Sequence, residues 1–219
     1  MGGRGADSGD LGNGNSENFN ASKDKDIWAY RHNPNNERFV DNINTTIKDM
    51  ADTYKGLMGA INDVYMAKVN KDTVMAYWAP GTGELGFSNK YGSMERMAKS
   101  YEECVKEGFH PSNGNKTAEQ AITAHEIGHA LTSVAQKNMG SRDFDEIAKK
   151  VVQDAKSILN KQAGKTRYRG TRKIAAGISE YAKSSNAECI AEATSDVYCN
   201  GSKASRESKA VVEALKKYL

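Results

Sequence analysis

The sequence has 219 residues, of which 38% are apolar and 27% charged, and its 31 basic and 28 acidic residues leave a formal net charge of +3. At roughly 100–200 residues per domain, this length suits one domain or two small ones. The composition excludes a collagen, a disulfide scaffold, a cysteine-rich zinc finger and a membrane-spanning protein, and the small net charge does not point to nucleic acid.

Residues 1–26 differ in composition from the rest of the chain. Six glycines fall in the first 14 positions, and a run rich in Ser, Asn and Asp follows. Such a segment buries too little apolar surface to offset the entropy of ordering it, so we expect a flexible tail followed by one domain over residues 27–219. The tail lacks the apolar centre of a signal peptide, and three unpatterned cysteines favour a reducing compartment. We therefore expect a cytoplasmic protein with no membrane partner.

Helical periodicity begins beyond the tail. Apolar residues from Val40 to Ile61 recur at three- and four-residue steps, which predicts one helix face. A β-prone run at 73–78, a turn at 80–83 and a second run at 84–88 then predict a β-hairpin.

The rest of the sequence is predicted to be helical. The run Thr117-Ala-Glu-Gln120 has the form of a capping box before a helix over 121–134. Further helices are expected at 94–105, 141–158, 174–182, 187–199 and 203–218. A basic loop at 161–173 interrupts this pattern. The sequence thus predicts a mainly helical α+β domain with one small β-hairpin.

The motif His125-Glu126-Ile127-Gly128-His129 lies inside the capped helix. Four residues advance a helix by slightly more than one turn, so both histidines project from one face about 6 Å apart and can bind one Zn²⁺. Glu126, beside the metal, can take a proton from a zinc-bound water and pass it to a leaving amine. Gly128 would let another backbone approach this helix closely. The alternative is a surface pair of histidines with a helical glutamate between them.

A catalytic zinc site requires a third protein ligand. Thr132 and Ala135 stand where the three-histidine pattern H-E-x-x-H-x-x-G-x-x-H needs Gly and His, which excludes that class. The other histidines, His32 after the tail and His110 in a turn-like loop, are expected to be ordinary surface or turn residues. A carboxylate on a later helix is therefore the better candidate.

Three acids, Glu188, Glu192 and Asp196, occur at four-residue spacing and share one face of the helix predicted at 187–199. They lie among Ala, Ile and Val, and they would repel one another if left unpaired. A divalent cation and the ring N–H of a ligand histidine would relieve that conflict, whereas the alternative is an exposed acidic stripe. Cys189 points about a quarter-turn away from this face, which favours a buried structural cysteine over a ligand.

The motif of residues 125–129 and the segment 178–193 together resemble a known family. They are similar to the gluzincin-type H-E-x-x-H zinc peptidase domains, which include the C-terminal domain of anthrax lethal factor and related domains of phage and mobile-element proteins. In that family a tyrosine precedes the glutamate ligand by seven residues and a second glutamate follows it by four. Tyr181, Glu188 and Glu192 reproduce both intervals.

The resemblance implies a zincin-like fold with specific roles for these residues. Glu188 would be the third zinc ligand, Glu192 would support the metal site without binding the ion, and the Tyr181 hydroxyl would stabilise the oxyanion. The predicted hairpin corresponds in position to the edge strand that aligns an extended substrate in zinc peptidases. This correspondence assigns the substrate strand to Glu84, Leu85, Gly86 and Phe87.

The sequence therefore predicts a zinc-dependent metalloendopeptidase that acts on a protein or peptide substrate. The likeness to phage domains implies a location in the cytoplasm or a virion-associated one. The alternative from another class is a non-catalytic, zinc-stabilised virion or structural module. A third interpretation is a basic nucleic-acid-binding protein, because residues 161–173 hold six basic side chains and Tyr168. A solvated loop between helices is the competing interpretation of that segment, and we do not expect nucleic acid as a partner.

Overall fold

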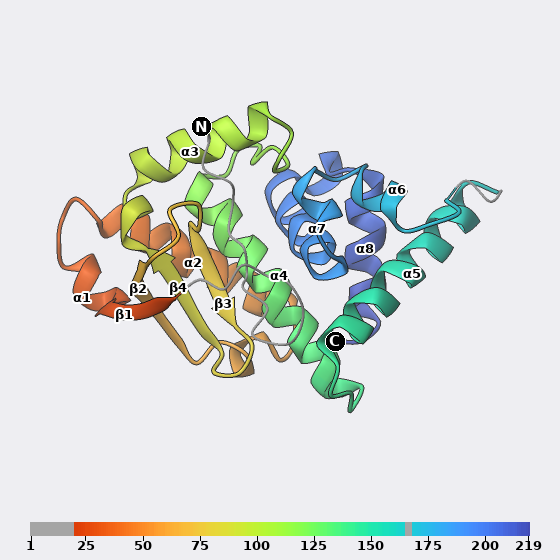
Figure 1. Cartoon of the computed structure of the whole chain (residues 1–219), viewed down its shortest axis with the longest axis horizontal. Coiled ribbons are helices and arrows are strands. Elements are labelled where there is room, and N and C mark those ends of the chain that lie inside the picture. Colours follow the sequence, from red (N-terminus) through yellow and green to blue (C-terminus); the bar gives the residue numbers. More distant parts are fainter. Residues whose placement is uncertain (1–19, 165–167) are drawn as a thin grey trace.

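The computed structural model describes residues 20–164 and 168–219, and within them the chain is mainly helical with one small mixed sheet. The predicted α+β class is therefore confirmed. The helices are α1 (Ile27–Arg31), α2 (Glu37–Thr53), α3 (Met94–Lys106), α4 (Ala118–Asn138), α5 (Phe144–Gln162), α6 (Arg172–Ala175), α7 (Asn186–Asn200) and α8 (Arg206–Lys216). Figure 1 shows the sheet and α1 to α3 on one side of α4, and α5 to α8 on the other.

The sheet has four strands in the order β1-β2-β4-β3. They are β1 (Ala21–Asp26), β2 (Asp63–Val69), β3 (Ala76–Ala79) and β4 (Glu84–Ser88). β3 and β4 are antiparallel and form the predicted hairpin, with Tyr77 opposite Gly86. β2 runs parallel to β4 and antiparallel to β1. β4 is therefore an interior strand, and among the strands that the structure describes β3 is the terminal one on its side of the sheet.

The tail predicted at residues 1–26 is wrong for Ala21–Asp26, because this segment forms β1 and pairs with β2. Every residue of β1 is exposed, so its sequence lacks the alternation of apolar and polar residues that reveals a half-buried strand. Pairing along β2, rather than burial of side chains, holds the segment extended. Residues 1–19 of the predicted tail lie outside the described residues.

Helix α2 ends at Thr53, so the helix predicted through Ile61 is too long. Gly56 has a φ of +83°, a conformation that suits glycine and leads the chain out of the helix. Leu57 and Ile61 are nevertheless buried in the main core together with the apolar face of α2. The periodicity identified core residues correctly, but it did not locate the end of the helix.

Helix α4 is the central element of the fold. Its start carries the predicted capping box, in which the Thr117 backbone N–H donates to the Gln120 side chain at 3.0 Å. β3 and the helices α2, α3, α5 and α7 all pack against α4. These contacts bury almost every residue from Ala118 to Ala135. The H-E-x-x-H motif therefore lies on a helix that is held from several sides.

The helices after α4 agree with the predicted ones except at residues 174–182. α5, α7 and α8 each begin after a side chain that accepts a backbone N–H, namely Asp143, Ser185 and Ser205. In place of one helix over 174–182, the short α6 is followed by a separate 3-10 turn, Tyr181–Lys183. Apolar residues of this segment are buried although they lie in short turns. Apolar residues in turns can recur at the same spacing as on a helix, so the sequence pattern does not distinguish the two.

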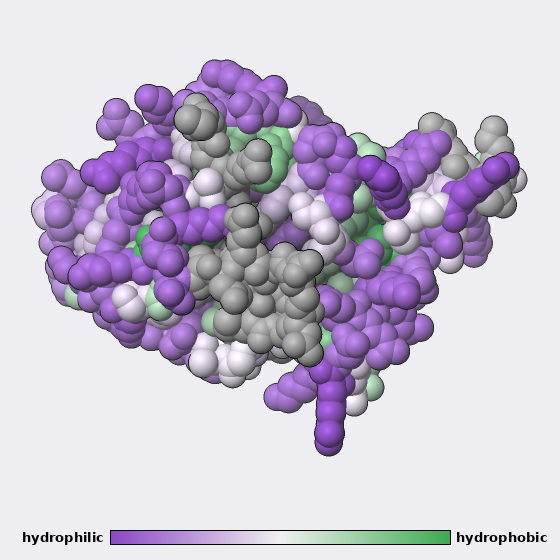
Figure 2. Space-filling view, in the orientation of Figure 1, coloured by the Kyte–Doolittle hydropathy of each residue, from purple (hydrophilic) through white to green (hydrophobic). Residues whose placement is uncertain are grey.

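The surface seen in Figure 2 is predominantly hydrophilic, with apolar residues confined to small patches. Large apolar side chains that are exposed in the described structure include Trp28, Met58 and Met139, which lie on different elements. Within residues 20–164 and 168–219, no helix combines the length and the apolarity needed to cross a membrane.

Candidate metal and catalytic site

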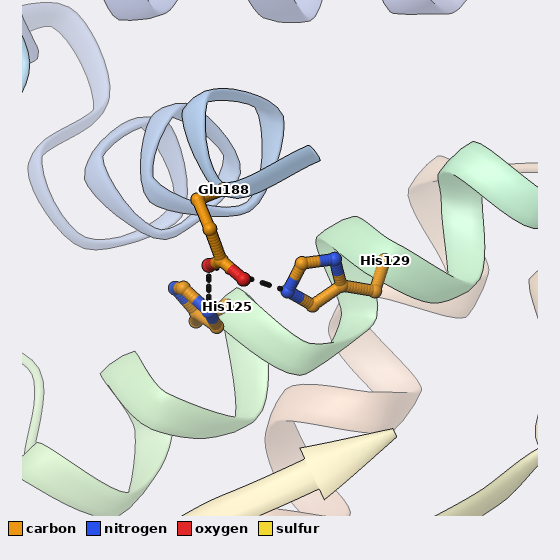
Figure 3. A group of neighbouring side chains, drawn as sticks. All are labelled: His125, His129 and Glu188. Carbon is orange, nitrogen blue, oxygen red and sulfur yellow. Dashed lines mark ion pairs between the residues drawn. The ribbon is translucent and has the colours of Figure 1, made fainter. Parts of the chain in front are cut away.

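Helix α7 approaches α4 closely at the H-E-x-x-H motif because Gly128 has no side chain. A Cβ at this position would lie 2.6 Å from the Cα of Ala191 and 3.2 Å from the Cβ of Thr194. The close backbone approach predicted for Gly128 is thus confirmed. Its consequence is visible in Figure 3, where α7 places a carboxylate above the two motif histidines of α4.

His125, His129 and Glu188 converge from these two helices into one group that could hold a metal ion. Oε2 of Glu188 lies 3.2 Å from Nε2 of His125 and 3.5 Å from Nε2 of His129. Two ligands held at ~2.0–2.1 Å in tetrahedral geometry lie about 3.3 Å apart, so these separations fit one zinc ion. All three side chains are buried, and the alternatives of a surface histidine pair and an exposed acidic stripe are therefore wrong.

The donor atoms of the two histidines are also available for a cation. Both Nε2 atoms are buried, and neither forms a hydrogen bond within the described residues. A buried polar atom left without such a bond costs about 1–3 kcal/mol, a penalty that a bound cation would remove. Two imidazoles and one carboxylate form a donor set that binds zinc and leaves a fourth position open. The residues present thus fit the ion expected from the sequence.

The charges of this group reinforce one another. Burial opposes the charged form of His125, but the facing carboxylates of Glu188 and Glu192 outweigh it and raise the pKa of the imidazole well above its ordinary value. Burial likewise opposes the charged form of Glu188, but His129 and His125 hold the pKa of that carboxyl far below its usual range. The site therefore favours positive charge facing a carboxylate, which is the environment a cation requires.

Glu126 is fully buried on α4 beside this group. Burial raises the pKa of its carboxyl, while His125, His129 and the backbone of Trp78 act in the opposite direction. Neither carboxylate oxygen has a hydrogen-bond partner of good geometry in the described structure. A buried carboxyl whose pKa is shifted toward neutrality can exchange a proton with a nearby group, which suits it to acid–base chemistry.

Tyr181 lies against the same histidine. Its ring stacks on His125 with the centroids 5.8 Å apart and the planes at 16°, and on Phe109 with the centroids 4.8 Å apart. The Tyr181 backbone N–H donates to the carbonyl of Phe109 at 3.1 Å. This bond joins the turn that carries Tyr181 to the loop after α3. The tyrosine singled out in the sequence therefore lies at the candidate site.

Glu192 contacts His125 on the side away from Glu188. Its Oε1 lies 2.7 Å from Nδ1 of His125, and its Oε2 accepts a hydrogen bond from the Ser179 hydroxyl at 2.7 Å. Burial opposes its charge, but His110 and His125 lower the pKa of the carboxyl to about 2. A carboxylate that accepts the Nδ1–H of a histidine leaves the Nε2 lone pair directed at a metal. This is the supporting position expected for Glu192.

The prediction that His110 is an ordinary surface or turn residue is wrong. His110 is 3% exposed, and its Nδ1 lies 2.8 Å from Oε1 of Glu192, the same oxygen that faces His125. It was missed because residue 110 lies in a loop with no helical or strand periodicity, so only long-range contacts bring it to Glu192. The Gly-Phe-His-Pro sequence of that loop is not a signal specific enough to have found it. His32 is exposed, as predicted.

Asp196, the third acid of the predicted row, does not reach the metal group. It is buried, and it accepts hydrogen bonds from the Asn200 side chain at 2.8 Å and from the Ser205 backbone N–H at 3.0 Å. The residue therefore ties the end of α7 to the start of α8. Four-residue spacing places Asp196 on the same face of α7 as Glu188. Asp196 is about two turns farther along the helix, however, and therefore lies beyond the metal group.

The substrate strand assigned to Glu84, Leu85, Gly86 and Phe87 requires a correction. These residues belong to β4, which is paired with β2 on one side and with β3 on the other, so its backbone cannot accept a further strand. Within residues 20–164 and 168–219 the terminal strand is β3, which also packs against α4. The sequence located the hairpin but could not order its two strands, because that order depends on β2.

Two further interpretations concern side chains outside the site. Tyr168 is 1% exposed and its hydroxyl contacts Glu207, so its ring is not presented for stacking on a nucleic-acid base. Residues 165–167 of the basic loop lie outside the described residues. Cys189 is buried and absent from the metal group, as predicted, and burial raises the pKa of its thiol to about 12.

No family model matches the sequence, and no curated protein or solved structure matches the chain.

Proposed function

We propose that this protein is a zinc-dependent metalloendopeptidase with a zincin-like fold of the gluzincin type. The observation that carries the proposal is the convergence of three buried donor atoms, all within 4.8 Å of one another, beside the buried carboxyl of Glu126. A metal site formed by three side chains keeps a position for water and substrate, whereas structural zinc sites are closed by four protein ligands. This difference favours an enzyme over a zinc-stabilised structural module.

His125, His129 and Glu188 would hold the ion. Zinc, when bound there, supplies Lewis-acid polarisation of the substrate carbonyl and activation of water at neutral pH. Oε1 of Glu192 accepts the hydrogen bond of the His125 Nδ1–H, with 2.7 Å between the oxygen and the nitrogen, so that the Nε2 lone pair faces the site. The buried surroundings of all four side chains exclude competing water and strengthen these electrostatic interactions.

Glu126 is assigned the proton transfers. Its raised pKa keeps the carboxylate basic enough to accept a proton from the attacking water, and the same carboxyl then donates that proton to the leaving amine. Tyr181 is assigned to the oxyanion, because its ring is held against the ligand His125 by stacking contacts. A phenol that is fixed before the reaction can donate to the developing negative charge without reorganisation.

We further propose that an extended peptide substrate pairs with β3 rather than β4. β3 is the terminal strand of the sheet in the described structure. The backbone of Trp78, a residue of β3, lies close enough to Glu126 to lower the pKa of its carboxyl. Pairing with a terminal strand aligns a peptide through backbone hydrogen bonds and leaves its side chains for specificity pockets. Such alignment would place a scissile bond close to Glu126.

The test is the substitution Glu126→Gln, assayed with the purified full chain on a broad peptide library and by zinc analysis. We expect the variant to retain one equivalent of zinc and to lose cleavage by a factor of about 10²–10⁴, the usual contribution of acid–base catalysis. Glu213→Gln is the matched control, because Glu213 is exposed on α8.

Full cleavage by the Glu126→Gln variant would refute the mechanism. A zinc-loaded wild-type chain that cleaves no peptide would instead favour the non-catalytic module.

A further inference from the structure

We propose that His110 is a positioning residue that holds Glu192 and, through it, sets the orientation of the metal ligand His125. This inference deepens the proposed function and rests on its metal site. It gives a role to a third histidine at a site where, among the described residues, the histidines of the metal group are the two of α4. His110 lies between α3 and α4, outside the segments that supply the ligands.

One oxygen atom connects the two histidines. Oε1 of Glu192 lies 2.7 Å from Nδ1 of His125 and 2.8 Å from Nδ1 of His110. Because a carboxylate oxygen only accepts, each histidine donates through an Nδ1–H. The Ser179 hydroxyl occupies Oε2 at 2.7 Å, so the carboxylate is held from three directions. Without His110, Oε1 would keep only the hydrogen bond from His125, and Ser179 alone would hold the other oxygen, so the carboxylate would be held less firmly in its orientation toward His125.

His110 is itself held in place by aromatic contacts. Its ring stacks on Tyr101, with the centroids 5.3 Å apart and the planes at 5°, and it meets the ring of Phe109 edge-on. The Tyr101 hydroxyl donates to the carbonyl of Pro111 at 3.0 Å, which fastens the loop beyond His110 as well. A donor with so little freedom loses little entropy when it binds Glu192, and it can therefore impose a direction on the carboxylate.

The loop of His110 is also joined to the turn of Tyr181. The backbone N–H groups of Glu180 and Tyr181 donate to the carbonyls of Gly108 and Phe109, at 2.9 and 3.1 Å. Ser179, which donates to the second oxygen of Glu192, precedes this turn and accepts the backbone N–H of Ala182. Glu192, on α7, therefore lies where its own helix meets three other segments, namely α4, the loop after α3 and the segment that leads into the turn of Tyr181. Removing the contact of His110 would therefore weaken the hold of Glu192 on the metal ligand His125.

Three substitutions separate the donor from the ring. His110→Asn retains an N–H donor close to the position of Nδ1, His110→Gln moves the donor toward the position of Nε2, and His110→Phe retains a ring that can stack on Tyr101 but has no donor. His32→Gln is the control, because His32 is exposed. The measurements are zinc affinity of the full-length apoprotein by competition with a chelating dye, and the absorption spectrum after loading with Co²⁺.

We expect His110→Phe and His110→Gln to weaken zinc binding by about 10–100-fold, the usual effect of losing an outer partner of a metal ligand. His110→Asn should recover most of the affinity and the wild-type Co²⁺ spectrum, a rescue that a general packing role of the ring does not predict. Wild-type affinity in His110→Phe would overturn the inference. If that variant does not fold, equal affinities of His110→Asn and His110→Gln would overturn it.

These outcomes are independent of peptide cleavage. If the predicted order of zinc affinities is found but no peptide is cleaved, the proposed enzyme fails and the role of His110 stands. If cleavage requires Glu126 but zinc affinity does not depend on His110, only the positioning role fails. A wild-type chain that does not bind zinc would overturn both.

Discussion

Tyr181 and Glu126 lie beside the group of His125, His129 and Glu188 but belong to different elements. Their side chains are held in position in different ways. Glu126 is fixed by the burial of α4 on several sides. Tyr181 comes from a 3-10 turn of three residues, and its position depends on stacking against His125 and Phe109. A group that stabilises transition-state charge must be held in position before the reaction. A three-residue turn constrains a side chain little, and the stacking contacts of the Tyr181 ring supply that constraint.

For a single side chain, we predict the effect of Tyr181→Phe. The substitution keeps both stacking contacts and removes only the hydroxyl, so zinc affinity should be unchanged. Loss of one oxyanion donor should lower kcat by about 10²-fold with little change in KM. Steady-state kinetics on a peptide cleaved by the wild-type chain, together with a zinc titration, provide the test.

Tyr198→Phe serves as the control, because its hydroxyl contacts Asp49 on the far helix α2. A Tyr181→Phe enzyme with wild-type kcat would remove the tyrosine from the mechanism.

At the scale of elements, the site depends on how α4 and α7 pack. Gly128 allows the two backbones to approach, and this approach carries Glu188 from the first turn of α7 to the motif histidines. Local sequence determines that each element is a helix, through the capping box of α4 and the Ser185 cap of α7. The distance between the helices is set by the absence of one side chain.

We therefore predict that Gly128→Ala disturbs the metal site without touching a ligand. Its Cβ would lie 2.6 Å from the Cα of Ala191, so the helices must separate. Overpacking of this kind costs about 1–3 kcal/mol, which urea unfolding of the apoprotein would measure, and zinc affinity should fall as well.

The matched control is Gly59→Ala, because a Cβ at Gly59 meets nothing within 4 Å. Unchanged stability and zinc affinity in Gly128→Ala would show that the close approach is not required.

At the scale of the whole molecule, the site connects the two halves of the fold. α4 packs against β3 on one side and against α7 on the other, as Figure 1 shows, so an ion shared by His125, His129 and Glu188 would join the central helix to the C-terminal helices. Binding to the native state alone stabilises it in proportion to the logarithm of ligand concentration over Kd.

We accordingly predict that zinc raises the Tm of the apoprotein. At a free zinc concentration ~100 times Kd, the gain is about 2.7 kcal/mol, or a Tm increase of about 5–11 °C for a chain of this size. Thermal unfolding with zinc and with a chelator measures the shift. Glu188→Gln should lose most of it, while Glu213→Gln should respond like the wild-type chain. An equal Tm with and without zinc would contradict the metal site.

Features that arise within one helix could be predicted from the order of the residues alone. The spacing of His125 and His129, the cap before α4, the need for Gly128 and the row containing Glu188 all follow from helical geometry, and the structure places them accordingly. Neighbours on one helix are separated by three or four residues, so a local pattern is enough to identify them.

Features that depend on contacts between distant segments became visible in the folded chain and not before. The exposed strand β1 is paired with β2, β4 is enclosed between β2 and β3, and His110 shares an oxygen of Glu192 with His125 across 82 residues of sequence. None of these has a periodic signature, because their partners come from other elements. Strand order and the environment of a loop histidine are set by long-range packing. Local residue patterns do not show which distant segments pack together.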